Sequence, residues 1–225
     1  GGLFVDTAKT KIDLDSLYDK AYYRRRRKNK NLLTNLLVDI SESFSFGIKE
    51  KMMRKYFDEG KKIAILDVGC GRGEFLKSIN CQLFEKFGFE VNMAAGEILQ
   101  DVAGITVYFG DFLKHNFVKK FDVICLWHVL EHLKEPVTYF KKIHEILADK
   151  GILIVSTPNT ESLGFSKGSE DWYHLDIPRH LFLYNEASFK FLCQKTDFKV
   201  VKTKDEFYDY GTDLFWSLRK SKTKI

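Results

Sequence analysis

Three glycines at alternate positions break the apolar stretch ILDVGCGRGEFL and raise the question of which ligand they were placed for. The glycines and their acidic neighbours are Asp67, Gly69, Gly71, Gly73 and Glu74. A glycine-rich turn between a strand and a helix lets a ligand approach the backbone closely, and phosphates, dinucleotides and other cofactors use such turns. The surrounding residues therefore decide which ligand this turn fits.

The spacing and charge of the turn argue against a phosphate ligand. The dinucleotide fingerprint is G-x-G-x-x-G, and Glu74 stands where its third glycine would be. No Gly-Lys-Ser/Thr follows, as a phosphate-binding loop would require. The carboxylates of Asp67 and Glu74 would also repel a pyrophosphate at the helix N-terminus. A NAD-dependent dehydrogenase is therefore disfavoured, and a cofactor with ammonium and sulfonium groups is favoured.

The pattern Asp67-x-Gly69-x-Gly71-x-Gly73 resembles motif I of the class I S-adenosylmethionine-dependent methyltransferases. The resemblance implies that Asp67 helps to orient the methionine amino end of the cofactor. It also implies that the backbone of the turn, including Cys70, lies against the cofactor. S-adenosylhomocysteine would be the product.

Three further strand ends carry residues that the resemblance assigns to the cofactor. Glu90 follows Gly73 by seventeen residues, and a carboxylate there can accept hydrogen bonds from both ribose hydroxyls. Asp111 would accept a hydrogen bond from the adenine amino group, while Phe112 or its backbone flanks the ring. The other residues assigned to the cofactor at these strand ends are Val91, Gly110, Leu126, Trp127 and His128.

The elements that must position these residues alternate between short β-branched runs and amphipathic helical patterns, which predicts βαβ units. Strands are predicted at residues 62–68, 84–91, 105–110, 121–127, 151–159, 198–204 and 213–220. A helix is expected over 135–151, and Asn185 is the expected N-cap of another. We therefore expect a Rossmann-like three-layer α/β/α sandwich with a mostly parallel seven-stranded sheet whose last strand is antiparallel.

Two domains of unequal size are expected. Residues 1–60 are predicted to form a helical extension that could close as a lid, and 61–225 the methyltransferase domain. The basic run RRRRKNK, residues 24–30, is interpreted as a solvated helix face in the first instance, and as a nucleic-acid or anionic membrane contact in the second.

Histidines supply the candidate groups for proton transfer to and from a methyl acceptor. HVLEHL at 128–133 and DIPRHLFLY at 176–184 resemble the ubiquinone-biosynthesis-type methyltransferases. The first candidate base is His132, followed by His174 and His128, with Glu131 able to orient a neighbouring imidazole. Residues that could contact the acceptor lie in one aromatic-rich segment: Trp172, Tyr173, His174, Arg179 and His180. Arg179 could grip a carboxylate or phosphate, or pair with Asp176 within the loop.

The stretch HVLEH also fits the H-x-x-E-H zinc protease pattern. A zinc protease site would need an exposed helix and a further carboxylate ligand. The segment instead follows directly from a predicted buried strand, so no metal is expected.

The composition is that of an ordinary globular protein. The net charge is +5, the four cysteines are scattered, and no apolar run is long enough to cross a bilayer, which together predict a reduced cytoplasmic protein. The leading hypothesis is an S-adenosylmethionine-dependent methyltransferase acting by in-line displacement on an oxygen or carbon of a small-molecule, glycan or lipid-linked acceptor. The alternatives are an RNA methyltransferase using the basic run, and a non-catalytic cofactor-binding module.

Overall fold

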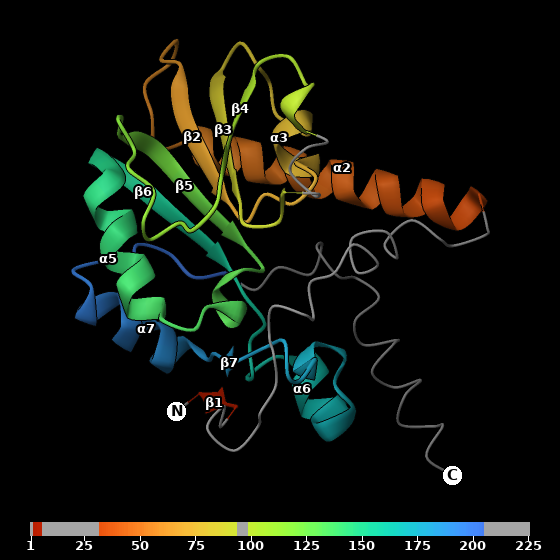
Figure 1. The fold of residues 1–225 in the computed structure, drawn as a ribbon. Coiled ribbons are helices and arrows are strands. Elements are labelled where there is room, and N and C mark those ends of the chain that lie inside the picture. Colours follow the sequence, from red (N-terminus) through yellow and green to blue (C-terminus); the bar gives the residue numbers. More distant parts are fainter. Residues whose placement is uncertain (1, 6–31, 94–98, 205–225) are drawn as a thin grey trace. The chain divides into compact units, whose positions relative to one another are not determined.

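The computed structural model describes residues 2–5, 32–93 and 99–204, with side chains from residue 43 onward in the first long helix (Figure 1). The basic run at 24–30 and the strand predicted at 213–220 lie outside the described residues. The chain divides into two compact units, one of residues 18–127 and 142–155, the other of 1–17, 128–141 and 156–225. The predicted domain boundary at residue 60 and the lid stay predictions.

The first unit, which we call the sheet unit, is built on a five-stranded sheet of order β4-β3-β2-β5-β6 (Figure 1). Its strands are β2 (Ile63–Val68), β3 (Phe84–Glu90), β4 (Ile105–Phe109), β5 (Phe121–Trp127) and β6 (Leu147–Ser156). The pairs β2–β3, β2–β5 and β3–β4 are parallel. Parallel strands end at one edge of the sheet, so residues that follow β2, β3, β4 and β5 gather there.

Apolar side chains on both sides of the strands explain why these segments form a buried sheet. Every residue of β2 is buried, as expected for a strand covered on both faces. Helix α2 (Leu32–Arg54) contributes Met53 to the core, and α3 (Glu74–Ser78) contributes Phe75 and Leu76. The two helices thereby fix the glycine turn, which lies between β2 and α3.

The second unit, which we call the histidine unit, consists of short elements. Two-residue strands β1 (Leu3–Phe4) and β7 (Phe182–Leu183) pair antiparallel. Its helical elements are η2 (Leu130–His132), the first part of α5 (Pro136–Ile146), α6 (Leu163–Gly168), η3 (Ser169–Asp171), η4 (Tyr173–Leu175) and α7 (Glu186–Lys195). Asn185 caps α7 as predicted, and a reciprocal hydrogen bond from its backbone to Ser188 completes a capping box.

The expected α/β fold with a mostly parallel sheet is confirmed, with two corrections. Residues 198–204 are described and contain no strand, although their β-branched pattern predicted one. The helix predicted to run to Gly151 ends at Ile146, and β6 begins at Leu147. A Cβ at Gly151 would approach the carbonyl oxygen of Ala148 to 2.8 Å, so a side chain there would force the backbone of β6 to shift. Among the described residues, none of the helices combines the length and apolar character needed to cross a bilayer.

Candidate functional site

Gly71, the middle glycine of the turn, presents its backbone to open space. Its φ of 55° lies in the left-handed region that favours glycine, and a Cβ placed there would meet no atom within 4 Å. At Gly73, with φ 72°, an added Cβ would instead collide with the side chain of Leu99. Gly73 is thus required by packing against Leu99, and Gly71 leaves room for a ligand against the backbone.

Glu90 ends β3 with its carboxylate held from two sides. Its Oε2 accepts a hydrogen bond from the Gly71 amide at 2.7 Å, and its Oε1 accepts one from the Asn92 amide at 2.9 Å. The side chain is buried, and burial raises its pKa although the backbone hydrogen bonds oppose the shift. Because each carboxylate oxygen has two lone pairs, both oxygens can accept a further hydroxyl donor.

Asp67 lies in β2 beneath the turn and is the second buried carboxylate of this site, 3% exposed. Burial raises its pKa well above the usual value, the positive charge of Lys49 opposes the shift, and the charge of Glu90 adds to it. Lys49 reaches this place from α2 and is itself buried. Its ammonium lies 4.2 Å from the centroid of the Trp127 ring, a cation–π contact. The site therefore combines two carboxylates with one ammonium group.

Trp127 ends β5 and meets Phe75 edge to face, with ring centroids 5.2 Å apart. Leu126 is fully buried and Cys70 nearly so, whereas Val91 is exposed. Burial raises the pKa of the Cys70 thiol far above the physiological range, which excludes it as a nucleophile. Trp127 thus presents an aromatic ring at this strand end. The side chains of Cys70 and Leu126 pack in the interior, and their predicted contacts with the cofactor stay predictions.

The end of β4 is more open than the ends of β2 and β3. Gly110 has φ 105° and free space beside it. Asp111 pairs with the Lys114 ammonium at 3.2 Å and accepts a hydrogen bond from the Leu113 amide, and these contacts lower its pKa. The ring of Phe112 is buried edge to face against Phe89, which leaves its backbone as the part able to face a ligand.

His128, the first residue of the histidine unit after β5, lies between a carboxylate and a hydroxyl. Its Nδ1 is 3.3 Å from Glu131 Oε1, and its Nε2 is 3.4 Å from Ser156 Oγ. Its φ of 54° is uncommon for a residue with a side chain. The backbone is held there because the His128 amide donates to the carbonyl of Ser156 at 2.9 Å. Such fixed orientation by a carboxylate is what a histidine base requires.

Glu131 is the central acidic group of the histidine unit and is 0% exposed. Burial alone would raise its pKa, but the His128 imidazole 3.3 Å away, together with the charges of His132 and His180, outweighs burial and lowers it. Its Oε2 accepts a hydrogen bond from Thr157 Oγ1 at 3.1 Å. The neighbouring imidazoles therefore favour the ionised form of this buried carboxylate.

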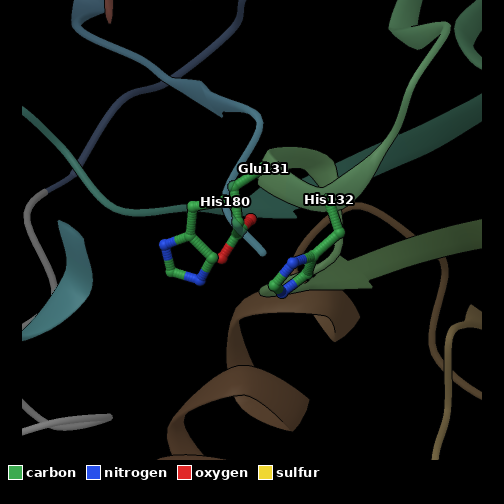
Figure 2. Close-up of side chains that lie close together, drawn as sticks. All are labelled: Glu131, His132 and His180. Atoms are coloured by element: carbon green, nitrogen blue, oxygen red, sulfur yellow. The ribbon is translucent and has the colours of Figure 1, made fainter. Parts of the chain in front are cut away.

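Two further imidazoles lie beside Glu131, as Figure 2 shows for His132 and His180. His132 Nδ1 is 3.0 Å from the carbonyl oxygen of Arg179, and His180 Nδ1 is 2.7 Å from that of His174. Burial lowers the pKa of His180, against the charge of Glu131. His132, the first candidate base from the sequence, thus contacts a backbone carbonyl, whereas His128 contacts a carboxylate and a hydroxyl.

The aromatic-rich segment is divided between buried and exposed side chains. Trp172 is buried edge to face against Phe165, with centroids 5.3 Å apart, so it packs within the loop. Tyr173 is exposed. His174 is buried and stacks on His128 with centroids 6.1 Å apart. Arg179 pairs with Asp176, the loop-internal alternative considered from the sequence.

A family model described as a methyltransferase domain matches residues 23–203, most of the chain. The chain belongs to the methyltransferase domain family. This confirms the class I S-adenosylmethionine-dependent methyltransferase predicted from the glycine turn, and with it the predicted cofactor.

Curated relatives of this methyltransferase domain are ubiquinone biosynthesis O-methyltransferases. The protein from Cereibacter sphaeroides strain ATCC 17023 is 24% identical over 140 residues, which are 53% of this chain and 57% of the relative. The protein from Histophilus somni is 30% identical over 108 residues, 42% of this chain and 44% of the relative. The chain thus spans about half the length of the curated relatives it matches.

Solved structures show the same fold at low sequence identity. The plantazolicin methyltransferase BpumL, solved with a pentazolic analogue and S-adenosylhomocysteine, aligns with a TM-score of 0.59 at 16% identity over 92% of this chain and 87% of its own. Phosphoethanolamine N-methyltransferase 2 of Haemonchus contortus, solved with S-adenosylmethionine, aligns with a TM-score of 0.57 at 15% identity over 79% and 43%. These likenesses support the methyltransferase fold.

Lys49 is the residue of this methyltransferase site that sequence reasoning missed. Ser45, Lys49 and Met53 are spaced by four residues and all are buried, so they share one face of α2. A lysine in the buried line of an amphipathic helix is a signal that spacing alone could have provided.

Proposed function

We propose that this chain transfers a methyl group from S-adenosylmethionine to a hydroxyl oxygen of a small-molecule acceptor. The cofactor carries two positive charges, one carboxylate, two ribose hydroxyls and no phosphate. The single observation that carries the proposal is the Glu90 carboxylate, held at 2.7 Å by the amide of Gly71 beside open space. The ubiquinone biosynthesis O-methyltransferases among the relatives support oxygen as the acceptor atom.

Six residues of the sheet unit are assigned to different parts of the cofactor. Glu90 accepts the ribose hydroxyls, for which both its oxygens have lone pairs. Asp67 balances the amino group, and Lys49 meets the carboxylate of the same methionine end. Trp127 forms an apolar wall, and the Phe112 backbone borders the adenine with Asp111 as the acceptor for its amino group. The bound cofactor supplies an electrophilic methyl group on a sulfonium centre.

His128 is the proposed base for the acceptor hydroxyl. It follows the cofactor-wall residue Trp127 directly in the chain, and the carboxylate of Glu131 lies 3.3 Å from its Nδ1. With Nδ1 oriented towards Glu131, Nε2 takes the proton from the acceptor oxygen. Ser156 Oγ lies 3.4 Å from Nε2, so the acceptor hydroxyl would take the place of this contact.

The experiment measures cofactor binding and methyl transfer separately. Calorimetry with S-adenosylhomocysteine on the full chain should show binding, and mass spectrometry should detect a mass gain of one methyl group on hydroxylated aromatic acceptors. His128→Gln should abolish transfer, and the variant should still bind S-adenosylhomocysteine because Glu90 and Asp67 are unchanged. A wild-type chain that does not bind S-adenosylhomocysteine would refute the cofactor site. Binding with transfer to carbon or nitrogen alone would refute the hydroxyl acceptor.

A further inference from the structure

Glu131, His132 and His180 gather one carboxylate and two imidazoles at a single place in the histidine unit (Figure 2). One possible ligand atom from each residue lies within 4.8 Å of the others. Glu131 and His132 come from η2, and His180 comes from the segment just before β7. The amide of Leu181 donates to the carbonyl of Glu131 at 2.7 Å, so the backbone holds these two segments together.

Backbone carbonyls orient both imidazoles as metal ligands are usually oriented. The Nδ1 atoms of His132 and His180 lie 3.0 Å and 2.7 Å from carbonyl oxygens. A neutral imidazole that donates from Nδ1 has its lone pair on Nε2. Metal-binding histidines almost always donate their other ring N–H to a carbonyl or carboxylate, which fixes the tautomer. Both rings therefore have outer partners of the kind that metal ligation requires.

Glu131 provides the negatively charged ligand and an oxygen that needs a partner. Its side chain is fully buried, and Oε1 has no hydrogen bond of acceptable geometry even though His128 Nδ1 lies 3.3 Å away. Its other oxygen accepts from Thr157 Oγ1. A buried carboxylate oxygen without a full partner is costly, and a cation beside it would remove that cost.

We propose that Glu131, His132 and His180 bind a divalent transition-metal ion, with Zn²⁺ as the best match. Two imidazoles and a carboxylate are a common zinc ligand set, whereas Mg²⁺ and Ca²⁺ prefer oxygen ligands alone. Zinc lies about 2 Å from each ligand atom, so ligand atoms about 3.3 Å apart complete a tetrahedron. On binding the ion the three side chains would have to close from the observed separation of up to 4.8 Å. The fourth position is open to water or another donor.

The proposed site differs from the H-x-x-E-H pattern in the sequence. That pattern would place His128 and His132 on one helix with a later carboxylate as third ligand. In the structure Leu130–His132 is a single 3₁₀ turn, and the third ligand is His180, which lies far along the chain. The site therefore ties two segments of the histidine unit together, which gives the metal a structural effect that can be measured.

The test uses the full chain after removal of metal by a chelator. After zinc is added back, the wild-type protein should retain one equivalent of zinc through gel filtration. It should then unfold at a higher temperature than the metal-free protein. Loaded with Co²⁺ instead, it should give the visible absorption band of a tetrahedral site. Replacing a ligand, in His180→Ala or Glu131→Gln, should weaken zinc binding by more than the about 10- to 100-fold typical of losing an outer partner. Thr157→Val removes an outer partner of Glu131 and should fall within that range.

His144→Ala is the matched control, because His144 is an exposed histidine on α5 outside the cluster. It should bind zinc as the wild type does. Circular dichroism verifies that each variant is folded, and if a ligand variant fails to fold the Co²⁺ band of the wild type decides. A cluster held together by a shared proton instead of a metal would retain no zinc and give no Co²⁺ band. That result, or undiminished zinc binding by folded His180→Ala, would overturn the proposal.

Discussion

Glu90 is the side chain to which we assign the ribose of the cofactor. Both of its oxygens are fixed by backbone amides, at 2.7 Å from Gly71 and 2.9 Å from Asn92. Because these donors come from the two loops that flank the site, the carboxylate needs no rearrangement to accept hydroxyl groups. The binding contribution of Glu90 should therefore be large for one residue.

Glu90→Gln should weaken S-adenosylhomocysteine binding by about 10- to 100-fold, the range expected when a hydrogen bond to a charged group is lost. Calorimetry measures the effect. Glu85→Gln is the control, since Glu85 lies on the same strand but is exposed and pairs with Lys119. Equal affinity of wild type and Glu90→Gln would show that Glu90 does not contact the cofactor.

The raised pKa values of Asp67 and Glu90 predict that cofactor binding releases protons. In the free protein, burial raises both pKa values. At a pH just above the ordinary pKa of a carboxyl group, Asp67 and Glu90 are therefore still protonated in part of the population. A cationic cofactor favours the ionised carboxylates and lowers these pKa values. Affinity for S-adenosylmethionine should therefore rise as pH increases through the raised pKa values, and fall in acid.

Calorimetry in two buffers of different ionisation enthalpy measures the released protons. Glu90→Gln should release fewer protons than the wild type because one of the two groups no longer titrates. Proton uptake on binding, or release unchanged by the substitution, would contradict this assignment.

At the scale of elements, helix α7 shows how a local signal sets a boundary. Asn185 accepts a hydrogen bond from the Ser188 amide at 2.9 Å, and Ser188 Oγ accepts one from the Asn185 amide at 2.9 Å. Asn185→Ala should lower the free energy of unfolding by about 1 kcal/mol, the usual contribution of an N-cap. Urea unfolding measures the change. Gln194→Ala, an exposed substitution within α7, should leave stability nearly unchanged.

Elements specified by local pattern were predictable, and those that depend on distant partners were not. The buried run of β2 and the cap of α7 follow from neighbouring residues. Residues 198–204 have a strand-like composition, but a strand also needs a paired neighbour, which composition does not supply. The glycine turn and Glu90 were predictable because they occupy strand ends. The meeting of Glu131 with His180 was not predicted, since it arises from packing between separate segments. Lys49 was missed although its spacing from Ser45 and Met53 carried a signal.

At the scale of the whole molecule, the chain passes between its two units, within the described residues, at Trp127–His128, Lys141–Lys142 and Val155–Ser156. This division separates the two sets of functional residues. Apart from His128, the residues assigned to the cofactor belong to the sheet unit, and the three proposed metal ligands belong to the histidine unit. The hydrogen bonds that fix Glu90 come from the sheet unit, and those that fix the two imidazoles come from the histidine unit.

Cofactor and zinc binding should therefore be separable by mutation. Glu90→Gln should weaken S-adenosylhomocysteine binding and leave zinc affinity unchanged, and His180→Ala should do the reverse. Among the described residues, the hydrogen bonds given above for Glu90 and for the two imidazoles have different partners. The free energies lost on binding each ligand should therefore add in the double variant to within about 0.5 kcal/mol. Calorimetry of both ligands on the four proteins completes the cycle. A larger coupling free energy would mean that the cofactor and metal residues act on each other, and that the two units respond to ligands as one.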